Sequence, residues 1–219
     1  MSLRKTAFVT GEYYHLYNRG NSKQLIFRDE NDYSRFLYLL YVSNTKLNFD
    51  SRCLKKDFLS FDRGPRLVSI GVYCLMPNHF HLVVTQTEKG SISKFIQKLT
   101  TAYSMYYNKK YNRTGSLFEG KFKSQYANSD RYLKYLFSYL HLNPVKILDK
   151  NWRKDGIKNR KQALEFLKNY KYSSYQDYLG IKRPESAILN TEDFPNYFPT
   201  KEKFQKEIFE WLLYGEKDL

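Results

Sequence analysis

The clearest pattern of apolar and polar positions lies between Gly71 and Gln86, in the sequence GVYCLMPNHFHLVVTQ. Two apolar runs flank Pro77 and Asn78, a dipeptide typical of tight turns, so the stretch predicts two strands joined as a hairpin. Beyond the turn, residues 82–84 are all apolar, which favours a strand buried on both faces of a sheet. We therefore expect this hairpin to lie at the centre of a β-sheet.

Three helices are predicted by apolar residues that recur at helical spacing. Their starts are marked by the N-cap Asp29, by Gly90-Ser91 and by Ser129-Asp130. The third helix is expected to end at Pro144, because the residue before a proline disfavours helical geometry. A strand over Glu12–Asn18 precedes the first helix. A last amphipathic helix is predicted by Phe204, Ile208, Trp211 and Leu212.

Two parts of the chain lack a clear period. Thr45–Arg66 is rich in lysine and arginine and ends with Gly64-Pro65, which indicates a basic, irregular connection. Such a segment is either a solvated loop or a nucleic-acid contact. After Lys146 the chain becomes strongly charged, and we expect a partly helical extension there.

The charge of the chain points to nucleic acid. Among 219 residues, 37 lysines and arginines oppose 22 acids, giving a net charge of +15. Nucleic acid is the first partner this excess suggests and an anionic membrane the second. The 21 tyrosines and 16 phenylalanines favour a single-stranded ligand, whose bases stack on aromatic rings. The alternative is that many of these rings simply fill a core.

The cellular compartment is predicted from what the sequence lacks. Two cysteines, Cys53 and Cys74, do not make a disulfide framework. The start of the chain has no apolar run typical of a signal peptide, and no stretch approaches the length of a membrane span. The sequence therefore predicts a cytoplasmic protein that does not contact a membrane.

His79 and His81 flank Phe80 just after the predicted turn. Because side chains alternate along a strand, both imidazoles point to one face and Phe80 to the other. Two fixed imidazoles supply half of a metal site. The alternatives are two half-buried strand histidines, or a zinc site completed by Cys74. The other strand histidine, His15, is interpreted as structural.

Lys109–Lys123, with the sequence KKYNRTGSLFEGKFK, carries five basic residues among aromatic ones. We interpret it as a basic turn that leads into a strand, on which Lys121 and Lys123 share one face. Together with Arg113 they predict a DNA contact, although an ordinary solvated hairpin has the same composition.

The third predicted helix carries a second face formed by Tyr132, Tyr135, Tyr139 and Asn143. Tyr139 and Asn143 are neighbours because they are four positions apart. This pair offers a phenol and an amide oxygen to one site, but a half-buried tyrosine face explains the same pattern.

Four motifs taken together resemble a known family. They are, in chain order, MPNHFHLVV, a long helix, RTGSLFEGKFKS and YLFSYLHLNPVK. Their order and spacing resemble those of the single-tyrosine HUH transposases, especially the REP-associated tyrosine transposase-like proteins. The resemblance covers about residues 11–180. It implies an α+β, ferredoxin-like fold with an antiparallel sheet and helices on one face. We therefore predict a catalytic domain over residues 1–146 and a helical extension over residues 147–219.

The resemblance also implies a mechanism. His79 and His81 would bind a divalent metal, Mg²⁺ or Mn²⁺, with Asn143 as the third ligand. Tyr139 would attack the scissile phosphate of single-stranded DNA beside a hairpin or inverted repeat, forming a 5′-phosphotyrosine and a free 3′-hydroxyl. Apart from the resemblance, the basic residues Arg19, Arg113, Lys121 and Lys123 are expected to bind the DNA, and a homodimer is an open expectation.

Two other classes remain open from sequence. One is a non-catalytic or domesticated nucleic-acid-binding protein of the same fold that acts on chromosomal repeats. The other is a rolling-circle initiator or relaxase, which shares the histidine pair and the tyrosine chemistry but usually belongs to a larger chain.

Overall fold

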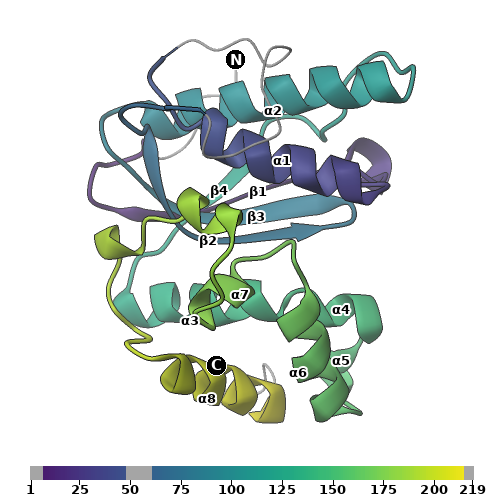
Figure 1. Cartoon of the computed structure of the whole chain (residues 1–219), viewed down its shortest axis with the longest axis vertical. Helices are drawn as coiled ribbons and strands as arrows, with labels where there is room; N and C mark the ends of the chain where they lie inside the picture. Colours follow the sequence, from purple (N-terminus) through teal and green to yellow (C-terminus); the bar gives the residue numbers. More distant parts are fainter. Residues whose placement is uncertain (1–6, 48–60, 215–219) are drawn as a thin grey trace.

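A four-stranded antiparallel sheet forms the centre of the protein (Figure 1), whose computed structural model describes residues 7–47 and 61–214. Its strands are β1 (Tyr13–Arg19), β2 (Val68–Met76), β3 (His79–Gln86) and β4 (Lys123–Tyr126). They lie in the order β2-β3-β1-β4, and the chain runs strand, helix, strand, strand, helix, strand. This is the ferredoxin-like arrangement, so the predicted α+β fold is confirmed.

The central hairpin forms where the apolar pattern predicted it. Strands β2 and β3 are joined at Pro77 and Asn78, and every residue of β2 is buried. The pairing of the two strands shifts between Ile70 and Val72. At Gly71, a Cβ would lie 3.0 Å from ring atoms of Phe137 and Phe194, so this position has little space for a side chain.

Helices α1 (Glu30–Val42) and α2 (Ser91–Lys110) cover one face of the sheet (Figure 1). Asp29 caps α1 as expected, because its side chain accepts a hydrogen bond from the backbone N–H of Asp32. The core between these helices and the sheet is apolar and aromatic. Its largest fully buried side chains include Tyr73, Phe36, Phe80, Phe95 and Tyr103.

Helix α3 (Asp130–Leu142) packs on the other face of the sheet (Figure 1). Its residues Leu136 and Phe137 share a buried cluster with Val72 and Val83 of the central hairpin. The expectation that the helices would lie on one face was therefore wrong in this detail. Fully buried central strands have two apolar faces, and each face requires a covering layer.

The region after Pro144 is helical in part, as predicted. It contains α4 (Val145–Leu148), α5 (Trp152–Asp155), α6 (Arg160–Asn169), α7 (Tyr175–Tyr178) and α8 (Lys201–Tyr214), with short 3₁₀ turns at Pro184–Ile188 and Thr191–Asp193. Segments of it cover the outer edge of β2, where Leu75 N–H donates to Tyr172 O and Ser174 N–H donates to Tyr73 O. The opposite edge of the sheet is β4, only four residues long.

The basic segment 109–123 has an irregular course. The strand begins only at Lys123, so Lys121 lies in the bend before it. Of the connection Thr45–Arg66, residues 48–60 lie outside the described residues. Among the residues that are described, no helix has both the length and the apolar character that a membrane crossing requires.

Candidate active site

Two imidazoles from neighbouring strands meet on the α3 face of the sheet. Strands β1 and β3 are antiparallel, with His15 opposite Val83 and Tyr17 opposite His81. Nε2 of His15 lies 2.9 Å from Nδ1 of His81, so one of these nitrogens donates its hydrogen to the other. Sequence analysis gave His15 no functional role, because the contact depends on strand pairing between segments 66 residues apart.

His79 lies beside His81 on the same strand face, as the alternation predicted. The two ring centres are 4.9 Å apart. The Nδ1–H of His79 donates to Oδ1 of Asn78 at 2.6 Å, which leaves Nε2 as the nitrogen with the lone pair. The turn residue Asn78 therefore orients His79.

Burial keeps these imidazoles neutral at physiological pH. It lowers the pKa of His15 to about 4 and, together with the nearby charges of Lys146 and Arg19, the pKa of His79 to about 4. The pKa of His81 is also well below its usual value, mainly through burial and then through the neighbouring histidines. Neutral imidazole is the form that binds metal ions.

Tyr139 of α3 lies over this histidine cluster. Its ring centre is 6.5 Å from that of His15 and 6.5 Å from that of His81. The other tyrosines of the same helix face continue away from it: the ring of Tyr135 packs at a tilt against Tyr139 and also contacts Trp211 of α8. Tyr139 therefore stands at the histidine end of the row.

Arg153 of α5 joins Tyr139 and Asn143. Its guanidinium carbon is 4.1 Å from the centre of the Tyr139 ring, and one of its nitrogens lies 3.5 Å from Oδ1 of Asn143. Asn143 is 1% exposed, and its Nδ2 has no hydrogen-bond partner in the described structure. Sequence analysis missed Arg153, because the arginine comes from the extension and no motif includes it.

The donor atoms fit a mixed-ligand metal site better than a zinc site. Within the described residues, no three His, Cys, Asp or Glu side chains are arranged to hold a metal. Burial raises the pKa of the Cys74 thiol well above its usual value, which disfavours a thiolate ligand. By contrast, burial keeps the imidazoles of His79 and His81 neutral. In Asn143 the atom without a partner is the donor Nδ2, while Oδ1, the atom that could bind a cation, lies 3.5 Å from a nitrogen of Arg153. Two imidazoles and an amide oxygen suit a divalent cation with open positions.

The four predicted DNA-binding residues do not form one surface. Lys123 lies opposite Tyr17 in the β1–β4 pairing, so it faces the histidine side of the sheet. Lys121 lines a cavity on the α2 side, and the expectation that the two lysines share a face was wrong, because the bend before β4 breaks the alternation. Arg19 is paired with Glu119. Arg113 lies 5.6 Å from the ring centre of Tyr107, beside α2.

His141 has a structural role in the core. It is fully buried behind α3, and its Nε2 is 2.8 Å from Oγ of Ser174. Its ring also packs against Tyr178 and Phe204. Tyr139 and His141 therefore point to opposite sides of the helix, as the helical period requires.

The fold and the site define a ferredoxin-like domain in which a histidine pair on the central strand faces a tyrosine on a covering helix. Residues 66–143 match the family model described as transposase IS200 like, so this segment is similar to that family. This range includes His79, His81, Tyr139 and Asn143, and the resemblance found in the motifs is confirmed. The strand with His15 and the helix with Arg153 lie outside the matched range.

The fold is also similar to that of a solved REP-associated tyrosine transposase bound to a REP hairpin. The two share 12% sequence identity with a TM-score of 0.49, over 89% of this chain and 96% of the other. No curated protein gives a significant match to the sequence.

Proposed function

We propose that this protein is a metal-dependent endonuclease and strand transferase that acts on single-stranded DNA and forms a covalent bond to Tyr139. The observation that carries the proposal is the position of the Tyr139 ring, 6.5 Å from the rings of both His15 and His81. A phenol beside neutral imidazoles, on a strongly basic protein with a segment similar to the IS200-like family, suits nucleophilic attack on a phosphodiester.

In the proposed reaction, the Tyr139 oxygen forms a bond to phosphorus as the bond from phosphorus to the 3′-oxygen breaks. The proton of the phenol goes to a base, and the leaving 3′-oxygen takes up a proton. The products are a 5′-phosphotyrosine and a free 3′-hydroxyl. Since the covalent bond retains the energy of the phosphodiester, a second 3′-hydroxyl can reverse the step and join the strand to a new end without ATP.

His79, His81 and Asn143 are the residues proposed to hold the metal. A divalent cation bound there would neutralise charge on the scissile phosphate and polarise it. The hydrogen bonds that link His79 to Asn78 and His81 to His15 hold both rings in place. Burial keeps the rings neutral, so their lone pairs stay available at neutral pH.

Arg153 adds a positive charge beside the nucleophile. Its guanidinium contacts the Tyr139 ring and the Asn143 side chain, close to where the negative charge of the phosphate would lie. The extension over residues 147–219 is therefore proposed to complete the catalytic domain of residues 1–146. Lys123 is the best placed of the four DNA-binding candidates, because it is exposed on the histidine side of the sheet, whereas Arg19 on the same side is paired with Glu119.

Covalent trapping tests the proposal. A hairpin-bearing single strand with a 3′ label is incubated with Mn²⁺, and the protein is then digested and the labelled peptide mapped. We expect the label on Tyr139, none with the Tyr139→Phe variant, and normal labelling with the matched control Tyr135→Phe, which removes the same oxygen one turn earlier. EDTA should abolish the adduct.

The alternative functions predict other outcomes. A non-catalytic DNA-binding protein would bind the hairpin and form no adduct under any metal condition. An adduct on Tyr135, or full adduct formation by Tyr139→Phe, would refute the assignment of the nucleophile. Adduct formation in EDTA would refute the metal requirement.

A further inference from the structure

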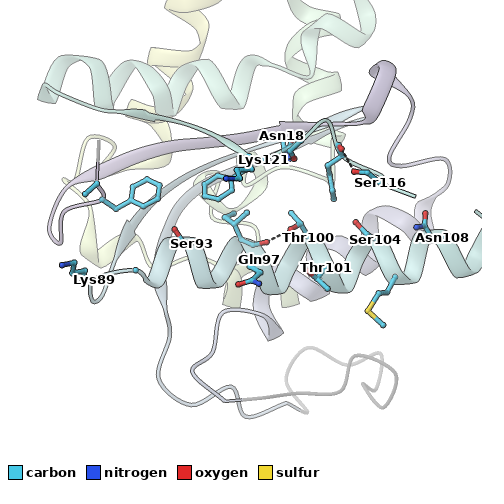
Figure 2. A pocket seen from close by; sticks show the side chains of 18 residues that line it. Asn18, Lys89, Ser93, Gln97, Thr100, Thr101, Ser104, Asn108, Ser116 and Lys121 are labelled. Atoms are coloured by element: carbon cyan, nitrogen blue, oxygen red, sulfur yellow. Dashed lines mark hydrogen bonds between the residues drawn. The ribbon is translucent and has the colours of Figure 1, made fainter. Parts of the chain in front are cut away.

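A second concave site lies on the side of the sheet away from the histidines. It is a cavity of about 1030 Å³ between α2 and the segment around residues 116–122 (Figure 2). Asn18 of β1 lines it, together with Phe118, which belongs to the core under α1 and α2. Because neighbouring strand residues point to opposite faces, Asn18 faces this cavity while Tyr17 and Arg19 face the histidine side.

One wall of the cavity is a polar stripe along α2. Figure 2 shows Ser93, Thr100, Ser104 and Asn108 on the side of the helix that faces Lys121. Oδ1 of Asn108 is buried and has no hydrogen-bond partner in the described structure, although its Nδ2 donates to Gly115 O at 3.0 Å. The wall therefore offers hydroxyl and amide groups to a ligand, and the amide oxygen of Asn108 has an unused capacity to accept a hydrogen bond.

The other wall is aromatic and the charge of the cavity is positive. Phe8 and Phe122 both line it, with their rings 6.4 Å apart and inclined by only 8°. None of the 18 residues that line the cavity is acidic, while Lys89 and Lys121 are basic. A neutral apolar ligand would not use the lysines, and an isolated phosphate would not use the rings.

We propose that this cavity binds unpaired nucleotides of the DNA substrate, with bases against the phenylalanine rings and the α2 stripe, and phosphates at Lys89 and Lys121. Aromatic rings combined with lysines are how proteins bind single strands without strong sequence preference. Amide and hydroxyl groups on the remaining wall can bond base edges. The volume is in the range of pockets that accommodate a ligand larger than one base.

The position of the cavity connects it to the proposed active site. Lys123 lies on the histidine side of the short edge strand β4, and Lys121, two residues earlier, lines the cavity. A single strand that passes over this edge can contact both lysines. The inference rests on the proposed function insofar as the bound strand belongs to the same DNA that Tyr139 would cleave.

A charge introduced into the polar wall tests the inference. Ser104→Glu places a carboxylate in the cavity, and Ser104→Gln is its neutral isostere, so the difference between them isolates the charge. Binding is measured in EDTA with Tyr139→Phe protein and a fixed hairpin that carries either no tail or six unpaired thymidines. We expect the tail to strengthen binding about tenfold in the parent and in Ser104→Gln, and Ser104→Glu to remove most of that gain.

Photocrosslinking locates the tail directly. With 5-iododeoxyuridine in the tail, we expect crosslinks to Phe8 or Phe122, and their loss in Ser104→Glu. The inference is overturned if the tail adds no affinity, if Glu and Gln behave alike, or if the crosslinks fall only on the histidine side of the sheet. Adduct formation on Tyr139 is measured separately, so failure of the proposed chemistry and failure of this binding site give different results.

Discussion

The hydrogen bond between His15 and His81 makes a sharp prediction about metal affinity. If Nδ1–H of His81 donates to Nε2 of His15, then Nε2 of His81 keeps its lone pair and can bind the metal proposed for this site. His15→Phe keeps an aromatic ring and deletes the acceptor. His15→Gln keeps an acceptor, because its amide oxygen can receive the same hydrogen.

The size of the effect follows from the contact. The two nitrogens are 2.9 Å apart and largely buried, so the hydrogen bond holds both the orientation and the tautomer of His81. Loss of such a partner lowers metal affinity roughly 10- to 100-fold. This corresponds to about 1.4 to 2.7 kcal/mol. We expect His15→Phe to show this loss and His15→Gln to recover a substantial part of it.

Calorimetric titration of the DNA-free protein with Mn²⁺ is the assay. His141→Gln is the matched control, because it removes another buried histidine that is bonded to Ser174 on the far side of α3. Its Mn²⁺ affinity should equal that of the wild type. Equal affinities of wild type and His15→Phe would refute the reasoning, and so would a His15→Gln variant that binds no better than His15→Phe.

Three further predictions concern Arg153, His141 and Gly71. Arg153→Met should slow adduct formation about 100-fold while hairpin affinity, measured in parallel, changes little; an unchanged rate would exclude a role beside Tyr139. Burial lowers the pKa of His141 to about 3, whereas the same imidazole in the unfolded chain protonates near pH 6.5. The folded state therefore has its full stability above pH 6.5, and it loses stability as the pH falls and the unfolded chain takes up a proton that the buried imidazole does not. From pH 7 to pH 5 the wild type should therefore lose about 2 kcal/mol through this residue, and urea unfolding of His141→Gln should show a correspondingly smaller loss. Gly71→Ala should destabilise the fold by about 1 to 3 kcal/mol in the same assay, because its Cβ meets two phenylalanine rings at 3.0 Å; a neutral effect would mean that the rings move freely.

Sequence by itself determined the parts of this protein that depend on near neighbours. The turn at Pro77 and Asn78 and the caps at Asp29 and Ser129 were readable because each depends on a few consecutive residues. The common face of His79 and His81 follows from strand alternation alone. Likewise, the opposite directions of Tyr139 and His141 follow from the helical period.

Tertiary structure decided everything that depends on which segments meet. Strand pairing brought His15 to His81, and the packing of α3 brought Tyr139, at one end of a row of equivalent tyrosines, to the histidines. Arg153 reached the site only because the extension folds back onto it. An irregular bend placed Lys121 and Lys123 on opposite faces of the sheet, although regular strand alternation would have placed them on the same face. Local periods act over a few residues, whereas these contacts are set by burial and register between distant segments, which no single stretch of sequence encodes.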